Sequence, residues 1–139
     1  MDTPIIRLDG RSTAAVAAAA REASGDYTLL YIGRGRLAGG DPARLAEIAR
    51  LNGAAMAYGD YVTATGESRE LTERLEGSLR DDFDYGEIVA VSTPLLREAA
   101  AALDPSMRAA GFYELTLMLS RRGTIVHARS EGEPLYIVD

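Results

Sequence analysis

The chain has 139 residues, 47% of them hydrophobic, and a formal net charge of −6 at neutral pH. A chain of this length suits one compact domain, which we expect to span residues 1–139, and its negative charge argues against nucleic acid as a partner. All fifteen basic residues are Arg, and there is one His and no Cys, which excludes a lysine Schiff base and a disulfide framework and leaves too few ligands for an ordinary structural zinc site.

The ends of the chain bear on its location. The N-terminal sequence Met-Asp-Thr-Pro has neither the basic start nor the apolar run of a secretory signal, and no stretch approaches about 18 consecutive apolar residues. We therefore expect no transmembrane segment and, by default, a cytoplasmic location. The abrupt end in Tyr-Ile-Val-Asp predicts that the chain is part of a longer protein.

The first half of the chain predicts two strand-helix units. Residues 4–8 predict a short strand, and Ser12 or Thr13 is placed to cap an Ala-rich helix that ends near Ala23. Residues 27–32 form a continuous apolar run, which is typical of a strand covered on both faces of a parallel sheet. A loop over 33–36 follows. Asp41 and Pro42 then predict the start of a second helix, which Gly53 ends.

The second half continues this alternation. Residues 69–76 are polar enough for a surface helix or an irregular arm, whereas the clearer signals predict strands over 54–63, 86–92, 124–128 and 135–138 and helices over 93–103 and 112–120. The order of elements predicts an α/β fold, with a Rossmann-like, mostly parallel sheet flanked by helices.

Ligands of open α/β sheets bind beyond the carboxyl ends of the strands, and the predicted strand exits are polar. The first exit carries Asp9 and Ser12. They fit either a ligand site, in which the carboxylate accepts a hydrogen bond from an N–H or hydroxyl group, or an ordinary turn and helix cap. The second carries Arg34 between two glycines, where an arginine contacts a phosphate or lies in a solvated loop. The third carries Asp60 and Tyr61, which fit either a sugar-binding carboxylate with an aromatic face or a strand-end turn.

The densest acidic cluster is Arg80-Asp-Asp-Phe-Asp84, which holds three carboxylates within four positions. Asp81 or Asp82 could bind acceptor hydroxyls, bind a metal or act as a general base, although such a run is also typical of a solvated face. Glu114, near the start of the predicted 112–120 helix, is a further candidate base or a partner for Arg108 or Arg122. His127 lies at a strand end, where a lone His is more often a hydrogen-bonding residue than a metal ligand.

Three blocks of the sequence resemble family 2 glycosyltransferases: Tyr58-Gly-Asp-Tyr61, Gly77-Ser-Leu-Arg-Asp-Asp-Phe-Asp-Tyr-Gly86 and Ala110-Gly-Phe-Tyr-Glu-Leu115. In particular, the chain is similar to a divergent domain that precedes an intact glycosyltransferase domain in some bacterial proteins of the Bacteroides group. The resemblance implies a nucleotide-diphospho-sugar transferase fold of the A type that lacks the first strand. It also implies transfer of a sugar from a nucleotide-diphosphate donor to a glycan acceptor in surface polysaccharide synthesis.

The resemblance further assigns roles to residues. It implies nucleotide-sugar contacts for Asp9, Ser12, Arg34, Asp60 and Tyr61, and a catalytic carboxylate among Asp81, Asp82 and Glu114.

Two positions depart from the family pattern. Gly33-Arg34-Gly35 replaces the family's Asp-x-Asp motif, and Phe112 stands at the position of the family's general base. The expected activity is therefore degenerate.

The same departures shape the expected cofactors and partners. No cofactor is expected, with Mn²⁺ or Mg²⁺ bound only if donor binding is retained. A nucleotide sugar or glycan and a neighbouring glycosyltransferase domain are the expected partners. The alternative is a non-catalytic module that docks onto a neighbouring glycosyltransferase domain or presents acceptor to it.

Overall fold

The computed structural model describes residues 5–8, 12–33, 35–66, 68–69, 85–103, 111–128 and 134–139. Within these ranges the chain forms two sheets and four helices. The α/β class predicted from the order of elements is therefore confirmed.

The larger sheet has five strands in the order β1-β2-β7-β4-β8. Their bounds are β1 Ile5–Arg7, β2 Tyr27–Tyr31, β7 Ile88–Ser92, β4 Met56–Gly59 and β8 Ile125–Ala128. β1 pairs with β2, and β4 with β8, in parallel, whereas the central β7 is antiparallel to both of its neighbours.

The smaller sheet has four strands in the order β3-β9-β5-β6. Their bounds are β3 Leu37–Gly40, β9 Tyr136–Val138, β5 Tyr61–Thr63 and β6 Ser68–Arg69. Only β5 and β9 pair in parallel in this sheet. The strand predicted over 54–63 is therefore two strands, because the chain leaves the larger sheet after Gly59 and enters the smaller one at Tyr61.

The prediction of a mostly parallel sheet was wrong, since the described strands make three parallel and four antiparallel pairings. The physical reason lies in burial. All five residues of β2 are buried, although β2 is parallel to β1 and antiparallel to β7. A continuous apolar run reports that both faces of a strand are covered, and it carries no information on strand direction.

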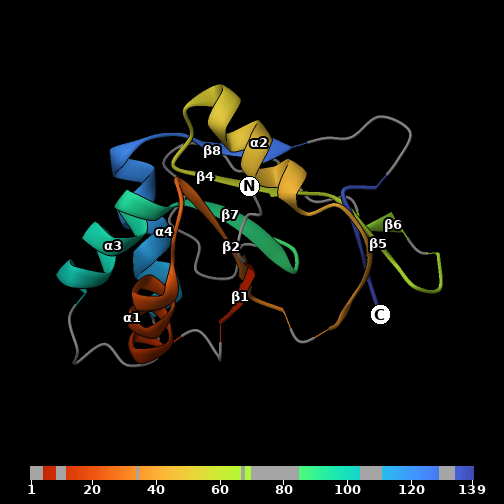
Figure 1. Ribbon diagram of the computed structural model, residues 1–139, viewed down its shortest axis with the longest axis horizontal. Coiled ribbons are helices and arrows are strands. Elements are labelled where there is room, and N and C mark those ends of the chain that lie inside the picture. Colours follow the sequence, from red (N-terminus) through yellow and green to blue (C-terminus); the bar gives the residue numbers. More distant parts are fainter. Residues whose placement is uncertain are drawn as a thin grey trace.

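Helices cover the larger sheet on both faces. Helices α1 (Thr13–Glu22), α3 (Thr93–Ala102) and α4 (Gly111–Arg122) lie together on one side, and α2 (Ala43–Asn52) lies on the other, with the smaller sheet beside it at one end (Figure 1). The predicted caps are present at Ser12, whose side chain accepts a hydrogen bond from the backbone of the first turn of α1, and at Gly53, which has a φ of 59°. The cap predicted at Asp41 was wrong, since Pro42 is the N-cap of α2 and makes no side-chain cap bond. At α3 the cap is Ser92, one residue before Thr93, where the Thr93-Pro94 pattern predicts it. No helix in the described part of the chain is long and apolar enough to cross a bilayer.

Two apolar cores result from the alternation of side chains along the strands. The first core joins the larger sheet to α1, α3 and α4, through Val16, Leu30, Met56, Val89, Leu96, Phe112, Leu115 and Leu119 among others. The second joins the opposite face of that sheet to α2 and β9, through Leu29, Leu45, Ala57, Ile88, Ala90, Leu135, Tyr136 and Val138 among others. The predicted buried helix over 112–120 is confirmed as the centre of α4.

Candidate functional site

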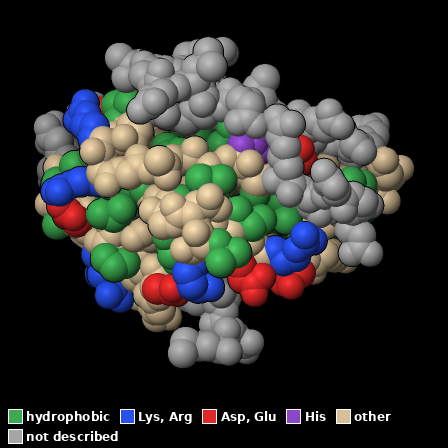
Figure 2. All heavy atoms as spheres, turned by 90° about the horizontal axis from the view of Figure 1, so that it is seen from above, with side chains coloured by type: hydrophobic (Ala, Val, Ile, Leu, Met, Phe, Trp, Pro, Cys, Tyr) green, Lys and Arg blue, Asp and Glu red, His purple; other side chains and the backbone are tan. Residues whose placement is uncertain are grey.

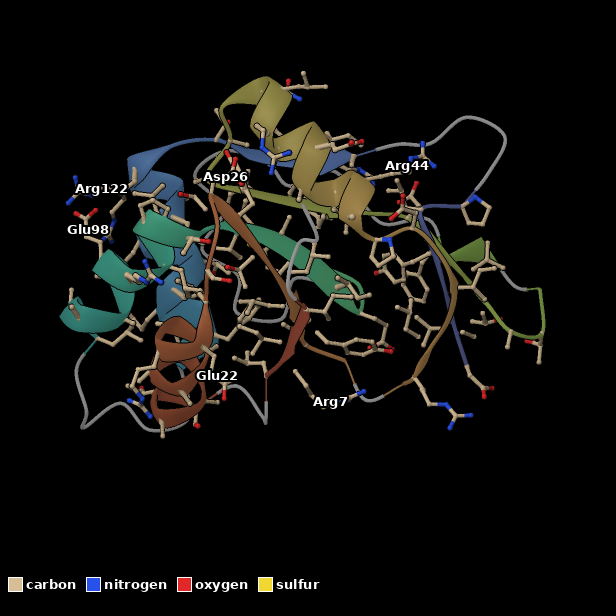
Figure 3. All side chains as sticks on the ribbon, viewed as in Figure 1. Arg7, Glu22, Asp26, Arg44, Glu98 and Arg122 are labelled. Atoms are coloured by element: carbon tan, nitrogen blue, oxygen red, sulfur yellow. The ribbon has the colours of Figure 1, made fainter. Side chains whose placement is uncertain are left out.

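One edge of the larger sheet gathers the polar ends of several elements. β1, β2, β4 and β8 all run in the same direction, so their carboxyl ends meet at this edge, and the antiparallel β7 begins there. We call this the carboxyl edge. Figure 3 shows Arg7 at this edge and Asp26 at the opposite end of β2.

Asp60 and His127 form the best-defined polar pair at the carboxyl edge. His127 Nε2 lies 2.7 Å from Asp60 Oδ1, and the exposed fractions of the two side chains are 1% and 30%. The parallel register places His127 opposite Tyr58, two residues before Asp60, which brings the pair together. The buried imidazole therefore orients a carboxylate that solvent reaches.

A chain of aromatic rings packs against the His127 side of this pair. The His127 ring stacks on Tyr58 with a centroid distance of 4.7 Å, and Tyr58 meets Tyr85 edge-on at 5.4 Å. Tyr85 in turn meets Phe112 edge-on at 6.0 Å. Edge-to-face and offset pairs at these distances are favourable. This aromatic chain connects β8, β4, the segment before β7 and α4, and we call it the aromatic floor.

A second aromatic pair lies in the smaller sheet, and one of its members, Tyr136, connects that sheet to the larger one. Tyr61 stacks on Tyr136 with a centroid distance of 5.1 Å, and the Tyr136 hydroxyl accepts hydrogen bonds from the backbone N–H groups of Glu87 and Ile88 at 2.9 and 3.2 Å. Burial raises the pKa of the Tyr136 hydroxyl above its usual value, so that it stays protonated across the physiological range. Tyr136 therefore fixes the first residues of β7.

The turn after β2 is held by Arg7. Its guanidinium donates hydrogen bonds to the carbonyl oxygens of Gly33 and Gly35 at 3.4 and 3.1 Å, and lies 4.4 Å from the centroid of the Tyr31 ring. Burial and the charge of Glu87 raise the pKa of the Tyr31 hydroxyl.

The Glu87 carboxylate fills the space beside this turn. A Cβ atom at position 33 would coincide with Glu87 Oε2, so only glycine is compatible with this placement. The sequence resemblance implies an aspartate at position 33. A carboxylate from a different strand thus occupies the space where that side chain would begin.

Two other candidate residues lie at helix starts on the same edge. Ser12 accepts a hydrogen bond from Ala15 N at 3.1 Å and so caps α1, as the turn-and-cap interpretation expects. Gly111 packs directly on the backbone of Ser12 and Thr13, which brings the start of α4 to that of α1. Glu114 is half-buried in the first turn of α4. Asp9, Arg34, Asp81 and Asp82 lie outside the described residues.

The structure therefore brings Ser12, Asp60, Tyr61 and the first turn of α4 to one edge of the sheet. A scan of the sequence against protein-family models and a search of curated proteins both return no match. Among the described residues, no group of three or more His, Cys, Asp or Glu side chains is placed to hold a metal ion.

Sequence reasoning missed Arg7, Glu87 and Tyr136 as members of this edge. The acidic residue that precedes the apolar run 88–92 is a weak signal for Glu87. That signal points to the carboxyl edge only when β7 is antiparallel, and the sequence pattern does not reveal its direction. Arg7 and Tyr136 lie on predicted strands, where nothing marks them as polar anchors of a turn.

The arrangement offers acceptors and aromatic faces. The Asp60 and Glu87 carboxylates accept hydrogen bonds from hydroxyl or amine donors, and Tyr61 adds a ring at the same edge. An aspartate held by a histidine also has the geometry to accept a proton from a bound hydroxyl. The edge thus offers hydrogen-bond acceptors and an aromatic face to a ligand that carries hydroxyl or amine groups.

Proposed function

We propose that the chain is a glycosyltransferase-like domain that binds a nucleotide-activated sugar at the carboxyl edge, and that its transfer activity is degenerate. The observation that carries this proposal is the Asp60–His127 pair on its aromatic floor. It combines an oriented, reachable carboxylate with neighbouring tyrosines, as recognition of a sugar requires. Asp60 and Tyr61 also belong to one of the blocks that resemble family 2 glycosyltransferases.

Further support comes from the mixed α/β fold and from the meeting of two helix starts at this edge. The start of a helix presents unpaired backbone N–H groups and a partial positive charge, which suits an anionic group such as a diphosphate. Ser12 and Gly111 bring α1 and α4 together there. In the proposed function, the donor lies over these helix starts and its sugar faces Asp60.

Degenerate transfer is favoured by Phe112. This residue stands where the resemblance implies the general base, is 2% exposed and packs edge-on against Tyr85 in the first core. A phenyl ring in the core cannot take a proton from an acceptor hydroxyl. Glu114, two residues further along α4, is the remaining described candidate for that role.

The rival function is a non-catalytic module that docks onto a neighbouring glycosyltransferase domain or presents acceptor to it. Phe112 and Gly33 favour this rival, because the position of the family's general base and the first position of its Asp-x-Asp motif carry no ionisable side chain. The two functions differ in whether this chain binds a nucleotide donor.

A calorimetric titration with UDP, GDP and their common sugars, with and without Mn²⁺, separates the two. The proposal expects a Kd at or below about 1 mM, equivalent to about −4 kcal/mol, for one nucleotide sugar. Asp60→Asn weakens that binding, whereas the matched variant Asp26→Asn at the opposite edge leaves it unchanged. If a folded chain binds none of these ligands, the donor site is refuted and the docking module stands.

A release assay then tests the degeneracy. A chain with degenerate activity binds the donor but releases nucleoside diphosphate no faster than a protein-free control. Turnover that depends on Glu114, measured with Glu114→Gln, contradicts the degenerate assignment.

A further inference from the structure

A polar pocket of about 400 Å³ lies between the start of β7 and the strands β5 and β9 of the smaller sheet. Pockets that hold small molecules have volumes of this order. The polar side chains that line it come from Glu87, Asp139, Tyr61, Thr63 and Thr65. It therefore draws on both sheets.

Glu87 is the unusual member of this pocket. Its Oε2 atom is buried and has no hydrogen-bond partner among the described residues, which also provide no ion pair for this carboxylate. A carboxylate taken partly out of water without a partner is unfavourable, so a native structure that keeps one calls for an explanation.

Arg7 and Arg36, the arginines described at this edge, do not neutralise Glu87. Arg7 donates to the carbonyl oxygens of Gly33 and Gly35, and Arg36 lies 3.6 Å from the Asp139 carboxylate in an exposed pair. Gly33 leaves room for the carboxylate but supplies no charge. The fold therefore holds the Glu87 carboxylate at a pocket, and the two described arginines beside it bind other acceptors.

The charge of the lining selects the ligand. Of the described residues that line the pocket, two carry a carboxylate and none is basic, and Arg36 pairs with one of the two, Asp139. The Glu87 carboxylate is then the charge that repels an anionic diphosphate and attracts a cation. The Thr63 and Thr65 hydroxyls, which lie 2.9 Å apart, add acceptor atoms, and Tyr61 adds an aromatic ring. An ammonium group has three N–H donors and interacts favourably with such a ring.

We infer that this pocket binds the protonated primary amine of a small hydroxylated molecule, with the Glu87 carboxylate as its counter-ion. The amine donates to Glu87 and to a threonine hydroxyl, and the ligand's own hydroxyl groups face Asp139 and solvent. This pocket shares Tyr61 and Glu87 with the carboxyl edge but is not lined by Asp60 or His127, and it does not require that the chain transfer a sugar.

Glucosamine and glucose provide the matched probes, because they share a ring and differ in an ammonium group in place of one hydroxyl. Titration of the whole chain, followed by heteronuclear NMR, is expected to show glucosamine binding at least tenfold more tightly than glucose, with shifts centred on Glu87 and Thr63. Because charge carries the difference, the preference is expected to shrink in high salt.

Single substitutions test whether Glu87 causes the preference for glucosamine. Glu87→Gln keeps the shape of the side chain and removes its charge, and is expected to reduce glucosamine affinity at least tenfold. Glu98→Gln, on α3, is expected to leave it unchanged. Asp139→Asn is expected to give a smaller loss, and it serves as the second test should Glu87→Gln fail to fold.

Three results would overturn the inference: equal binding of the two probes, no binding of glucosamine to the folded chain, or glucosamine affinity that survives Glu87→Gln. None of them depends on nucleotide binding. A failure here is therefore distinguishable from a failure of the proposed function.

Discussion

Tyr136 connects the two sheets through a single oxygen atom. Its hydroxyl accepts hydrogen bonds from two backbone N–H groups at the start of β7, and the Tyr136 side chain is fully buried. Tyr136 thus sets the backbone position of Glu87, a residue that belongs both to the carboxyl edge and to the proposed amine-binding pocket.

Tyr136→Phe is expected to leave those two N–H groups without their acceptor. An unsatisfied buried donor costs about 1–3 kcal/mol, so we expect a loss of that size in the free energy of unfolding. Urea denaturation followed by circular dichroism measures it. Leu51→Ala is the control, since Leu51 is 86% exposed and its truncation is expected to change stability by less than about 0.5 kcal/mol. A Tyr136→Phe protein as stable as the parent would contradict the anchoring role.

Asp26 and Arg50 form a two-point ion pair at the opposite end of β2, with N–O distances of 2.5 and 2.7 Å. Hydrogen bonding to Arg50 lowers the pKa of Asp26 from 3.8 to about 2. A carboxyl group whose pKa is lower in the folded state stabilises the fold fully above its unfolded pKa. That contribution is lost as the pH falls through the folded pKa.

The pair is about half exposed, so we expect Asp26→Asn to cost at most about 1 kcal/mol at pH 7. The difference between parent and variant is expected to shrink as the pH falls from 4 towards 2. Urea denaturation at a series of pH values measures it. A difference that stays constant down to pH 2 would contradict this assignment.

At the scale of elements, α1 and α4 meet through a glycine. A Cβ atom at position 111 would overlap the backbone of Ser12 and Thr13, whereas one at position 123 would lie 3.2 Å from the Ala55 Cβ atom. Neither contact can be relieved by rotating a side chain, but the closest atom at position 111 is the Thr13 backbone nitrogen at 2.4 Å, whereas at position 123 a shift of a few tenths of an ångström is enough.

Gly111→Ala is therefore expected to destabilise the fold by about 2 kcal/mol, which is typical of overpacking. Gly123→Ala, which adds the same methyl group at the other end of α4, is expected to cost less than half as much. Thermal and urea unfolding of the pair of variants measure the difference. Equal stabilities would mean that α4 does not begin against α1.

The sequence predicts where helices and strands lie along the chain better than it predicts the direction of each strand in its sheet. Thr93 followed by Pro94, and Gly53 after an apolar helical pattern, are local signals, and α3 begins and α2 ends close to where those signals predict. The direction of β7 depends on how the chain returns to the sheet, which no residue of Ile88–Ser92 encodes. The mostly parallel sheet was mispredicted for that reason.

In the candidate site too, single residues could be predicted from the sequence, whereas contacts that depend on strand pairing could not. Asp60 could be predicted because a polar residue directly follows a buried strand, and His127 because it lies near a strand end. Their 2.7 Å contact could not, since it depends on the pairing of β4 with β8. Glu87 was missed because it reaches the carboxyl edge only through the antiparallel β7.

In the whole molecule, helices cover both faces of the larger sheet, and polar and aromatic residues gather at its carboxyl edge. On the face shown in Figure 2, arginines and acidic side chains lie near one another around the rim, and the described residues on that face form no broad basic patch. Recognition at the carboxyl edge is therefore expected to rest on single oriented groups such as Asp60 and Glu87.

The most direct test of the proposed function is a heteronuclear NMR titration of the chain with the nucleotide sugar that binds best in calorimetry. The account predicts shift changes that concentrate on Ser12, Asp60, Tyr61, His127 and the first turn of α4, and that leave Asp26 and Thr93 at the opposite edge unmoved. Changes centred on the opposite edge or on α2, or none in a folded protein, would contradict it.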